Sequence, residues 1–112
     1  MKDYLLLFRG SLDSADVSPE QMQKSMMKWK NWMDGLAVEN RVNVGQRLTV
    51  TRATISGTVK RVVDGPYIEG KEIVGGYMMS KADTLEEAVE LAKGCPIFES
   101  GGSTEVIEIA AS

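Results

Sequence analysis

The segment Tyr4–Phe8 constrains the fold more than any other part of the chain, because all five of its residues are apolar. A strand with one solvated face alternates apolar and polar residues, whereas a continuous apolar run predicts a strand that is covered on both faces. Any fold for this chain must therefore supply a cover for each face of the first strand. The segment lacks the basic region, apolar length and cleavage site of a signal peptide.

A helix is predicted to begin after Ser18, which supplies an N-cap, with Pro19 in the first turn and Gln21 placed for a capping box. One stripe of this helix is apolar at alternating steps of four and three residues: Met22, Met26, Trp29, Met33 and Leu36. We expect this stripe to dock on a sheet as core. Trp32 lies off the stripe, and we expect it at a second interface.

The middle of the chain predicts strands and a rigid corner. Residues 41–56 alternate as a half-buried strand does, and residues 53–63 predict a hairpin that turns near Ser56-Gly57. Its second arm leads into Asp64-Gly65-Pro66, where glycine tolerates positive φ, proline fixes its own φ and the Asp carboxylate can accept a backbone hydrogen bond. The corner is thus a structural joint that carries one carboxylate.

The last part of the chain predicts a strand, a helix and a strand. Ile73–Met79 is β-rich, and the paired Gly75-Gly76 favours a bulge or a close backbone approach. Residues 83–87 cap a second helix that Gly94 and Pro96 end, with Cys95 as buried packing. Thr104–Ile109 closes the chain as a strand.

This order of elements predicts an α+β fold of the ferredoxin-like split βαβ type, with an antiparallel sheet and two helices on one face, formed by residues 1–112 as a single domain. Two helices cover only one face, yet Tyr4–Phe8 demands a cover on both. The simplest second cover is the sheet of another subunit, so we expect a homodimer packed sheet to sheet.

Composition excludes several classes of function. The 112 residues carry a net charge of −3, which gives no electrostatic reason to expect nucleic-acid or anionic-membrane binding. With one cysteine and no histidine, the chain excludes disulfide frameworks, structural zinc within a subunit and histidine-based triads. No segment approaches the roughly 18 apolar residues of a membrane span. We expect a soluble, cytoplasmic protein.

These residues together resemble the YCII-related family in its DGPF-motif branch. The resemblance is carried by Tyr4–Arg9, Ser18-Pro19-Glu20, Trp29, Trp32-Met33, Asp64-Gly65-Pro66-Tyr67, Glu69, Lys71, Glu72, Gly75-Gly76-Tyr77, Leu85–Ala88 and Cys95-Pro96. It implies a dimeric α/β barrel. Some relatives look like small enzymes in which an aspartate pairs with a histidine, and certain DGPF-type domains accompany transcription sigma factors. Here Asp64 matches the motif aspartate, no histidine exists to pair with it, and Tyr67 replaces the usual phenylalanine.

The candidate site surrounds the corner, with Asp64 as catalytic acid or base. The candidate ligand-binding residues are Arg9, Tyr67, Glu69, Lys71, Glu72 and Tyr77. Asp64, Glu69 and Glu72 show neither calcium-loop spacing nor a nitrogen donor, so we expect no metal, and we expect no cofactor.

Two functions stay open at this point. One is a small dimeric enzyme acting on a small polar or aromatic metabolite, in which Lys71 or Arg9 holds an anionic group. The other is a non-catalytic dimeric ligand-binding or regulatory module, in which the same residues brace a turn. A deep concave pocket lined by Asp64 and the tyrosines would favour the enzyme, and a filled corner in which Asp64 caps backbone would favour the module.

Overall fold

The computed structural model describes residues 1–11, 18–65 and 72–111. In chain order its elements are β1 (Lys2–Ser11), α1 (Pro19–Val38), β2 (Val42–Arg47), β3 (Ala53–Ser56), β4 (Arg61–Asp64), β5 (Glu72–Ala82), α2 (Leu85–Ala92), the 3-10 helix η2 (Pro96–Ser100) and β6 (Ser103–Glu108). The candidate residues Tyr67, Glu69 and Lys71 lie outside the described residues.

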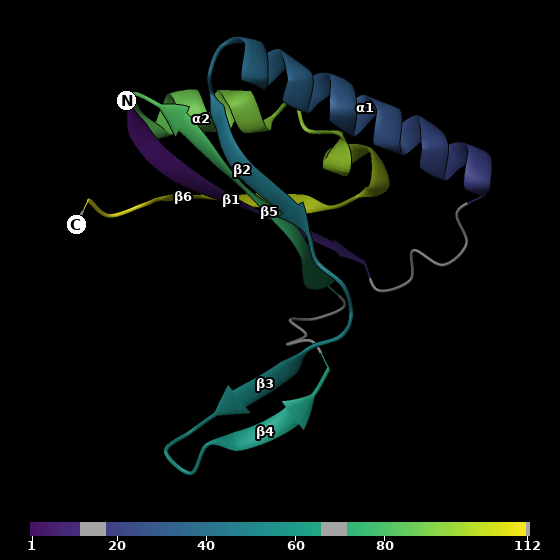
Figure 1. Ribbon diagram of the computed structural model, residues 1–112, viewed down its shortest axis with the longest axis vertical. Coiled ribbons are helices and arrows are strands. Elements are labelled where there is room, and N and C mark those ends of the chain that lie inside the picture. Colours follow the sequence, from purple (N-terminus) through teal and green to yellow (C-terminus); the bar gives the residue numbers. More distant parts are fainter. Residues whose placement is uncertain (12–17, 66–71, 112) are drawn as a thin grey trace.

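Four strands form one antiparallel sheet in the order β2-β5-β1-β6, with β1 in the interior between β5 and β6. The helices α1 and α2 lie on the same face of this sheet (Figure 1). This is the ferredoxin-like split βαβ arrangement, and it confirms the predicted α+β fold.

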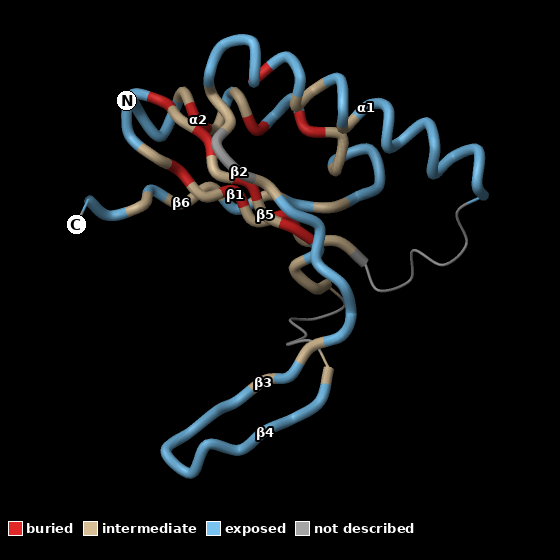
Figure 2. Tube along the Cα trace, in the orientation of Figure 1, coloured by how far each residue is buried: buried red, intermediate tan, exposed pale blue. Residues whose placement is uncertain are grey.

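The hairpin of β3 and β4 is inserted between β2 and β5 as a separate two-stranded sheet. It stands away from the four-stranded sheet (Figure 1), and almost all of it is exposed (Figure 2). Its four-residue turn has Gly57 at φ 75° and Lys60 at φ 57°, closed by a 3.1 Å hydrogen bond from the Lys60 N–H to the Gly57 carbonyl. The predicted hairpin is therefore confirmed, and we call residues 53–64 the arm.

Gly75 is a β-bulge, as the paired glycines predicted. Phe8 pairs with Gly76 and the next residue, Arg9, pairs with Val74, so Gly75 is left over on β5. The Gly75 carbonyl instead accepts a hydrogen bond of 3.0 Å from Leu48 N–H. A Cβ on Gly76 would lie 3.0 Å from a backbone oxygen of β2, so this position also needs glycine for close approach.

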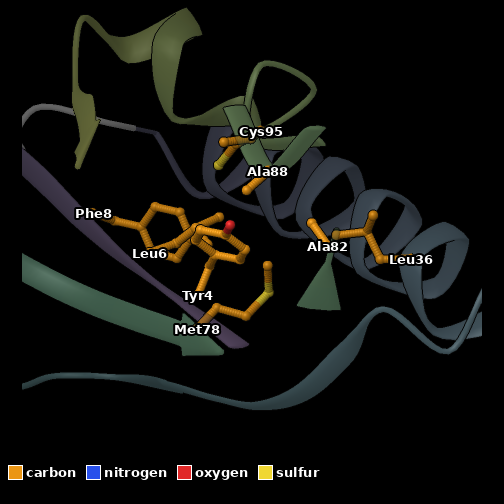
Figure 3. Close-up of a cluster of buried hydrophobic side chains, with 9 residues drawn as sticks. Tyr4, Leu6, Phe8, Leu36, Met78, Ala82, Ala88 and Cys95 are labelled. Atoms are coloured by element: carbon orange, nitrogen blue, oxygen red, sulfur yellow. The ribbon is translucent and has the colours of Figure 1, made fainter. Parts of the chain in front are cut away.

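The core fills the space between the sheet and the helices. On β1, Tyr4, Leu6 and Phe8 are buried and point toward the helices. They form a cluster with Leu36, Met78, Ala82, Ala88, Ala92 and Cys95 (Figure 3). Leu6 has no exposed surface, and burying a side chain of this size contributes about 1.5–3 kcal/mol.

Helix α1 begins as predicted, with the Ser18 hydroxyl accepting from Gln21 N–H at 3.2 Å and the Gln21 side chain closing the capping box. Only its C-terminal half docks. Leu36 is buried and Trp29 and Met33 are partly buried, but Met22 and Met26 are 50% and 57% exposed. The prediction that the whole stripe packs on the sheet is wrong for these two methionines, because the helix extends past the sheet at its N-terminal end (Figure 1).

Trp32 does not lie at a second interface. Its ring packs edge-on against Phe8 and Trp29, with centroid distances of 6.2 and 5.9 Å, and its Nε1–H donates to the Leu91 carbonyl at 3.2 Å. The expectation that Trp32 lies at a second interface is wrong, because α2 and the turn after it cover the side of α1 on which Trp32 lies. Gly94 leaves room for the ring, since a Cβ there would lie 3.0 Å from Nε1.

Helix α2 is capped by Thr84, whose hydroxyl accepts from Glu87 N–H at 3.1 Å. Its first turn is bound to the segment between α1 and β2 by an ion pair between Glu87 and Arg41. The guanidinium of Arg41 holds the pKa of the Glu87 carboxyl below its usual value through this hydrogen bond. Cys95 is buried as predicted, and burial raises the pKa of its thiol to about 11.

The second face of the sheet carries a half-buried apolar patch. Cross-strand pairs place Leu5 beside Met79 and Ile107, and Leu7 beside Tyr77. All five side chains are of intermediate exposure, and among the described residues the helices α1 and α2 lie on the opposite face. We call these five residues the open face.

Candidate active site

Asp64 lies at the base of the arm. It is the last residue of β4 and pairs with Ala53 across the hairpin. The following Gly65 has φ 99°, its N–H donates to the Arg52 carbonyl at 2.7 Å, and its carbonyl accepts from the Thr54 hydroxyl at 3.5 Å. The corner is therefore held by backbone groups and by Thr54.

The Asp64 carboxylate itself is exposed and makes no hydrogen bond or ion pair with another described residue. The backbone N–H groups ahead of Asp64 that its carboxylate was expected to cap belong to residues outside the described ranges, so this structural role stays a prediction.

A pocket of about 310 Å³ lies next to this corner, between the base of the arm, the end of β1 and the start of β5. Its lining residues are Arg9, Arg52, Ala53, Thr54, Glu72, Ile73 and Val74. The volume is at the lower end of the range that holds small-molecule ligands. The lining combines two guanidinium groups, one carboxylate, a hydroxyl and three apolar side chains.

The two arginines are held from different sides. Arg9 donates to Glu105 Oε1 at 2.6 Å from the next strand, and the Arg9 side chain is 25% exposed. Arg52 donates through Nε to the Thr49 carbonyl at 2.6 Å, and its Nη2 is buried without a partner in the described part of the chain. Two guanidinium groups facing one cavity suit a carboxylate, phenolate or similar anion.

The predicted site residues are only partly brought together. Arg9 and Glu72 line the pocket, and Asp64 lies at its margin opposite Ala53. Tyr77 lies on the open face opposite Leu7 and does not line the pocket.

Arg52 and Thr54 were not among the residues expected at the site. The hairpin register could have indicated them, because a hairpin that ends at Asp64 places the start of its first strand directly across from that aspartate.

A second hollow, of about 440 Å³, lies between α1 and η2. Its two lysines are already paired, Lys28 with Glu99 and Lys93 with Glu90, each at 2.8 Å. This hollow therefore offers no free cation to a ligand.

Residues 1–11, 18–65 and 72–111 contain no group of three or more His, Cys, Asp or Glu side chains that could hold a metal ion. In the same ranges no helix is long and apolar enough to cross a bilayer.

The fold and pocket define a small ferredoxin-like α+β protein whose cavity, at one end of its sheet, is lined by both polar and apolar side chains. The YCII-related domain matches residues 3–110, so the chain belongs to the YCII-related family. Among solved structures it is similar to 5-chloro-2-hydroxyhydroquinone dehydrochlorinase from Burkholderia phenoliruptrix AC1100, in complex with 2,5-dihydroxybenzoquinone. The TM-score is 0.55 at 14% identity, covering 97% of this chain and 95% of that one. No curated protein matched by sequence.

Proposed function

We propose that this YCII-family protein is a small cytoplasmic homodimeric enzyme that acts on a small anionic metabolite, polar or aromatic, in the pocket between the arm and β1. The observation that carries the proposal is the convergence of Arg9 and Arg52 on one cavity, whose lining residue Ala53 pairs across the hairpin with Asp64. The dehydrochlorinase of the same fold has a small polar ring compound as ligand, which supports this class of substrate.

In this proposal the charged and apolar residues of the site have different roles. Arg9 and Arg52 bind the anionic group of the substrate, and Ile73 and Val74 contact its apolar part. Asp64 takes or returns a proton as general acid or base, which requires it to come within about 2.6–3.2 Å of the transferred proton's heavy atom. Glu72 lies in the same lining and orients hydroxyl groups of the ligand. Tyr67, Glu69, Lys71 and Tyr77 remain candidate ligand contacts.

The homodimer is supported by the open face. A half-exposed patch of five large side chains on a sheet is typical of a surface that another molecule covers, and a sheet-to-sheet contact also meets the demand of Tyr4–Phe8 for two covers. Sedimentation equilibrium tests it directly. A folded monomer at micromolar concentration would contradict the dimer.

A non-catalytic binding module is the second candidate, and one observation favours it: Asp64 lies at the margin of the pocket and is not part of its lining. The two candidates share the ligand site and differ only in the role of Asp64.

The experiment separates binding from chemistry. Native mass spectrometry and thermal shift with a panel of small carboxylates and phenolates identify a ligand, and Arg52→Gln is expected to weaken its binding at least tenfold. Asp64→Asn is expected to retain binding and abolish turnover of that compound. Asp34→Asn, an exposed aspartate paired with Lys30 on α1, is the control with the same change of charge. If Asp64→Asn leaves turnover unchanged, the catalytic role of Asp64 is wrong, and if the wild type binds the compound without turning it over, the non-catalytic module is favoured.

A further inference from the structure

Several large apolar side chains of the arm are exposed to solvent. Ile55 and Val62 are directly opposite each other and are 66% and 60% exposed, and Val59 and Val63 are also exposed. An isolated two-stranded hairpin is marginally stable in water, because it has no second layer of structure against which to bury one of its faces. The arm stands clear of the four-stranded sheet (Figure 1), so its described contacts do not provide that layer.

One face of the arm joins this apolar pair to the candidate catalytic residue. Side chains alternate along each strand, so the opposed pairs Ala53–Asp64 and Ile55–Val62 share one face. The pairs Thr54–Val63 and Ser56–Arg61 share the other. A molecule that covers Ile55 and Val62 therefore also approaches Asp64.

We propose that the Ile55–Val62 face of the arm docks on a second copy of this chain, and that this contact encloses Asp64 and completes the site. The inference rests on the homodimer of the proposed function and goes beyond it, because it brings the arm face that carries Asp64 into the contact between copies. Removing water from around a carboxylate is a known way to prepare it for proton transfer.

Two observations favour a second copy as the occupant. Considering only the described residues, the arm and the open face are both apolar surfaces without a cover, and a two-fold axis lets one partner cover both. The arm alone is smaller than the roughly 20–30 residues that each side of a stable interface contributes, so it serves as an extension of the open-face contact.

The test changes polarity and keeps β-branching. Ile55→Thr/Val62→Thr retains β-branched side chains on the arm, and Val63→Thr makes the same kind of change on its other face. Sedimentation velocity over a dilution series should show the dimer dissociation constant raised at least tenfold by the double variant and by less than twofold by Val63→Thr. Hydrogen exchange should show arm amides protected in the dimer and unprotected in the double variant. Circular dichroism and the melting temperature, measured also on the single Val62→Thr variant, distinguish a folding defect from a docking defect.

The outcomes are distinguishable. A dimer whose dissociation constant and arm exchange are unchanged by the double variant would overturn the arm contact and leave the proposed dimer intact. A wild-type monomer at micromolar concentration would overturn both. Co-sedimentation of the wild type with phosphatidylcholine–phosphatidylserine vesicles, lost in the double variant, would assign the arm to a lipid surface and overturn the second copy as its occupant.

Discussion

Replacing Trp32 by phenylalanine tests how the C-terminal half of α1 is bound to the last turn of α2. The substitution keeps an aromatic ring beside Phe8 and Trp29 and removes the Nε1–H that donates to the Leu91 carbonyl at 3.2 Å. Trp29→Phe is the matched control. Trp29 packs edge-on against Phe8 with centroids 5.1 Å apart, and its indole makes no side-chain hydrogen bond within the described chain.

The magnitude follows from what each variant loses. Both substitutions delete the same atoms from a half-buried ring, so their packing losses are comparable. Only Trp32→Phe also loses a hydrogen bond. The Leu91 carbonyl still accepts from Gly94 N–H at 3.3 Å and is not left unsatisfied, so the extra loss is the net value of one hydrogen bond, about 1 kcal/mol.

The assay is guanidinium unfolding at a fixed protomer concentration, followed by the fluorescence of the remaining tryptophan and by circular dichroism. We expect the free energy of unfolding of Trp32→Phe to lie about 1 kcal/mol below that of Trp29→Phe. For a domain of this size this corresponds to a melting temperature lower by about 4–8 °C. Equal stabilities, or a less stable Trp29→Phe, would refute the assigned role of the Trp32 hydrogen bond.

Three further predictions concern other parts of the fold. Because burial raises the pKa of the Cys95 thiol to about 11, a thiol reagent at pH 8 should label native protein far more slowly than unfolded protein; equal rates would contradict the burial. Arg41 lowers the pKa of Glu87 below the unfolded value of 4.5, so this pair stabilises the fold above that pH and the benefit is lost as pH falls through the lower, folded pKa. The stability gap between wild type and Glu87→Gln should therefore be largest near pH 7 and close on acidification; a gap that widens in acid would contradict it. Gly102→Ala should destabilise the fold by about 1–3 kcal/mol in thermal unfolding, because the new Cβ would lie 2.7 Å from the Arg9 carbonyl oxygen; an unchanged melting temperature would show that this strand end can shift.

Local signals were sufficient wherever a few adjacent residues determine the geometry. Ser18 forms the predicted N-cap, Thr84 caps the second helix within the predicted residues 83–87, and Gly75 forms the predicted bulge. Caps and bulges are set by side-chain and backbone groups within a few positions of each other, so their sequence signatures are short and direct.

Packing between distant elements was predicted less well. The apolar spacing of α1 was right about periodicity, but it could not say that Met22 and Met26 lie beyond the end of the sheet. It also placed Trp32 away from the core, because periodicity describes one helix and says nothing of the turn that covers its flank.

The candidate site shows the same division. The sequence pointed to Asp64, Arg9 and Glu72, yet Arg52 enters the pocket only because the hairpin register places it near Asp64 and the sheet places it near Arg9. Contacts of this kind join residues far apart in the chain, and a linear pattern does not encode their distances.

By itself, the sequence determined the order of elements, the helix caps, the bulge and the α+β class, because each depends on short-range sterics, hydrogen bonding and periodic burial. The apolar run Tyr4–Phe8 further required two covered faces. Only the tertiary structure decided which residues line the pocket, that the arm stands clear of the sheet and that Asp64 shares a face with Ile55 and Val62. The physical reason is that strand pairing and packing fix these positions through contacts between segments distant in the chain.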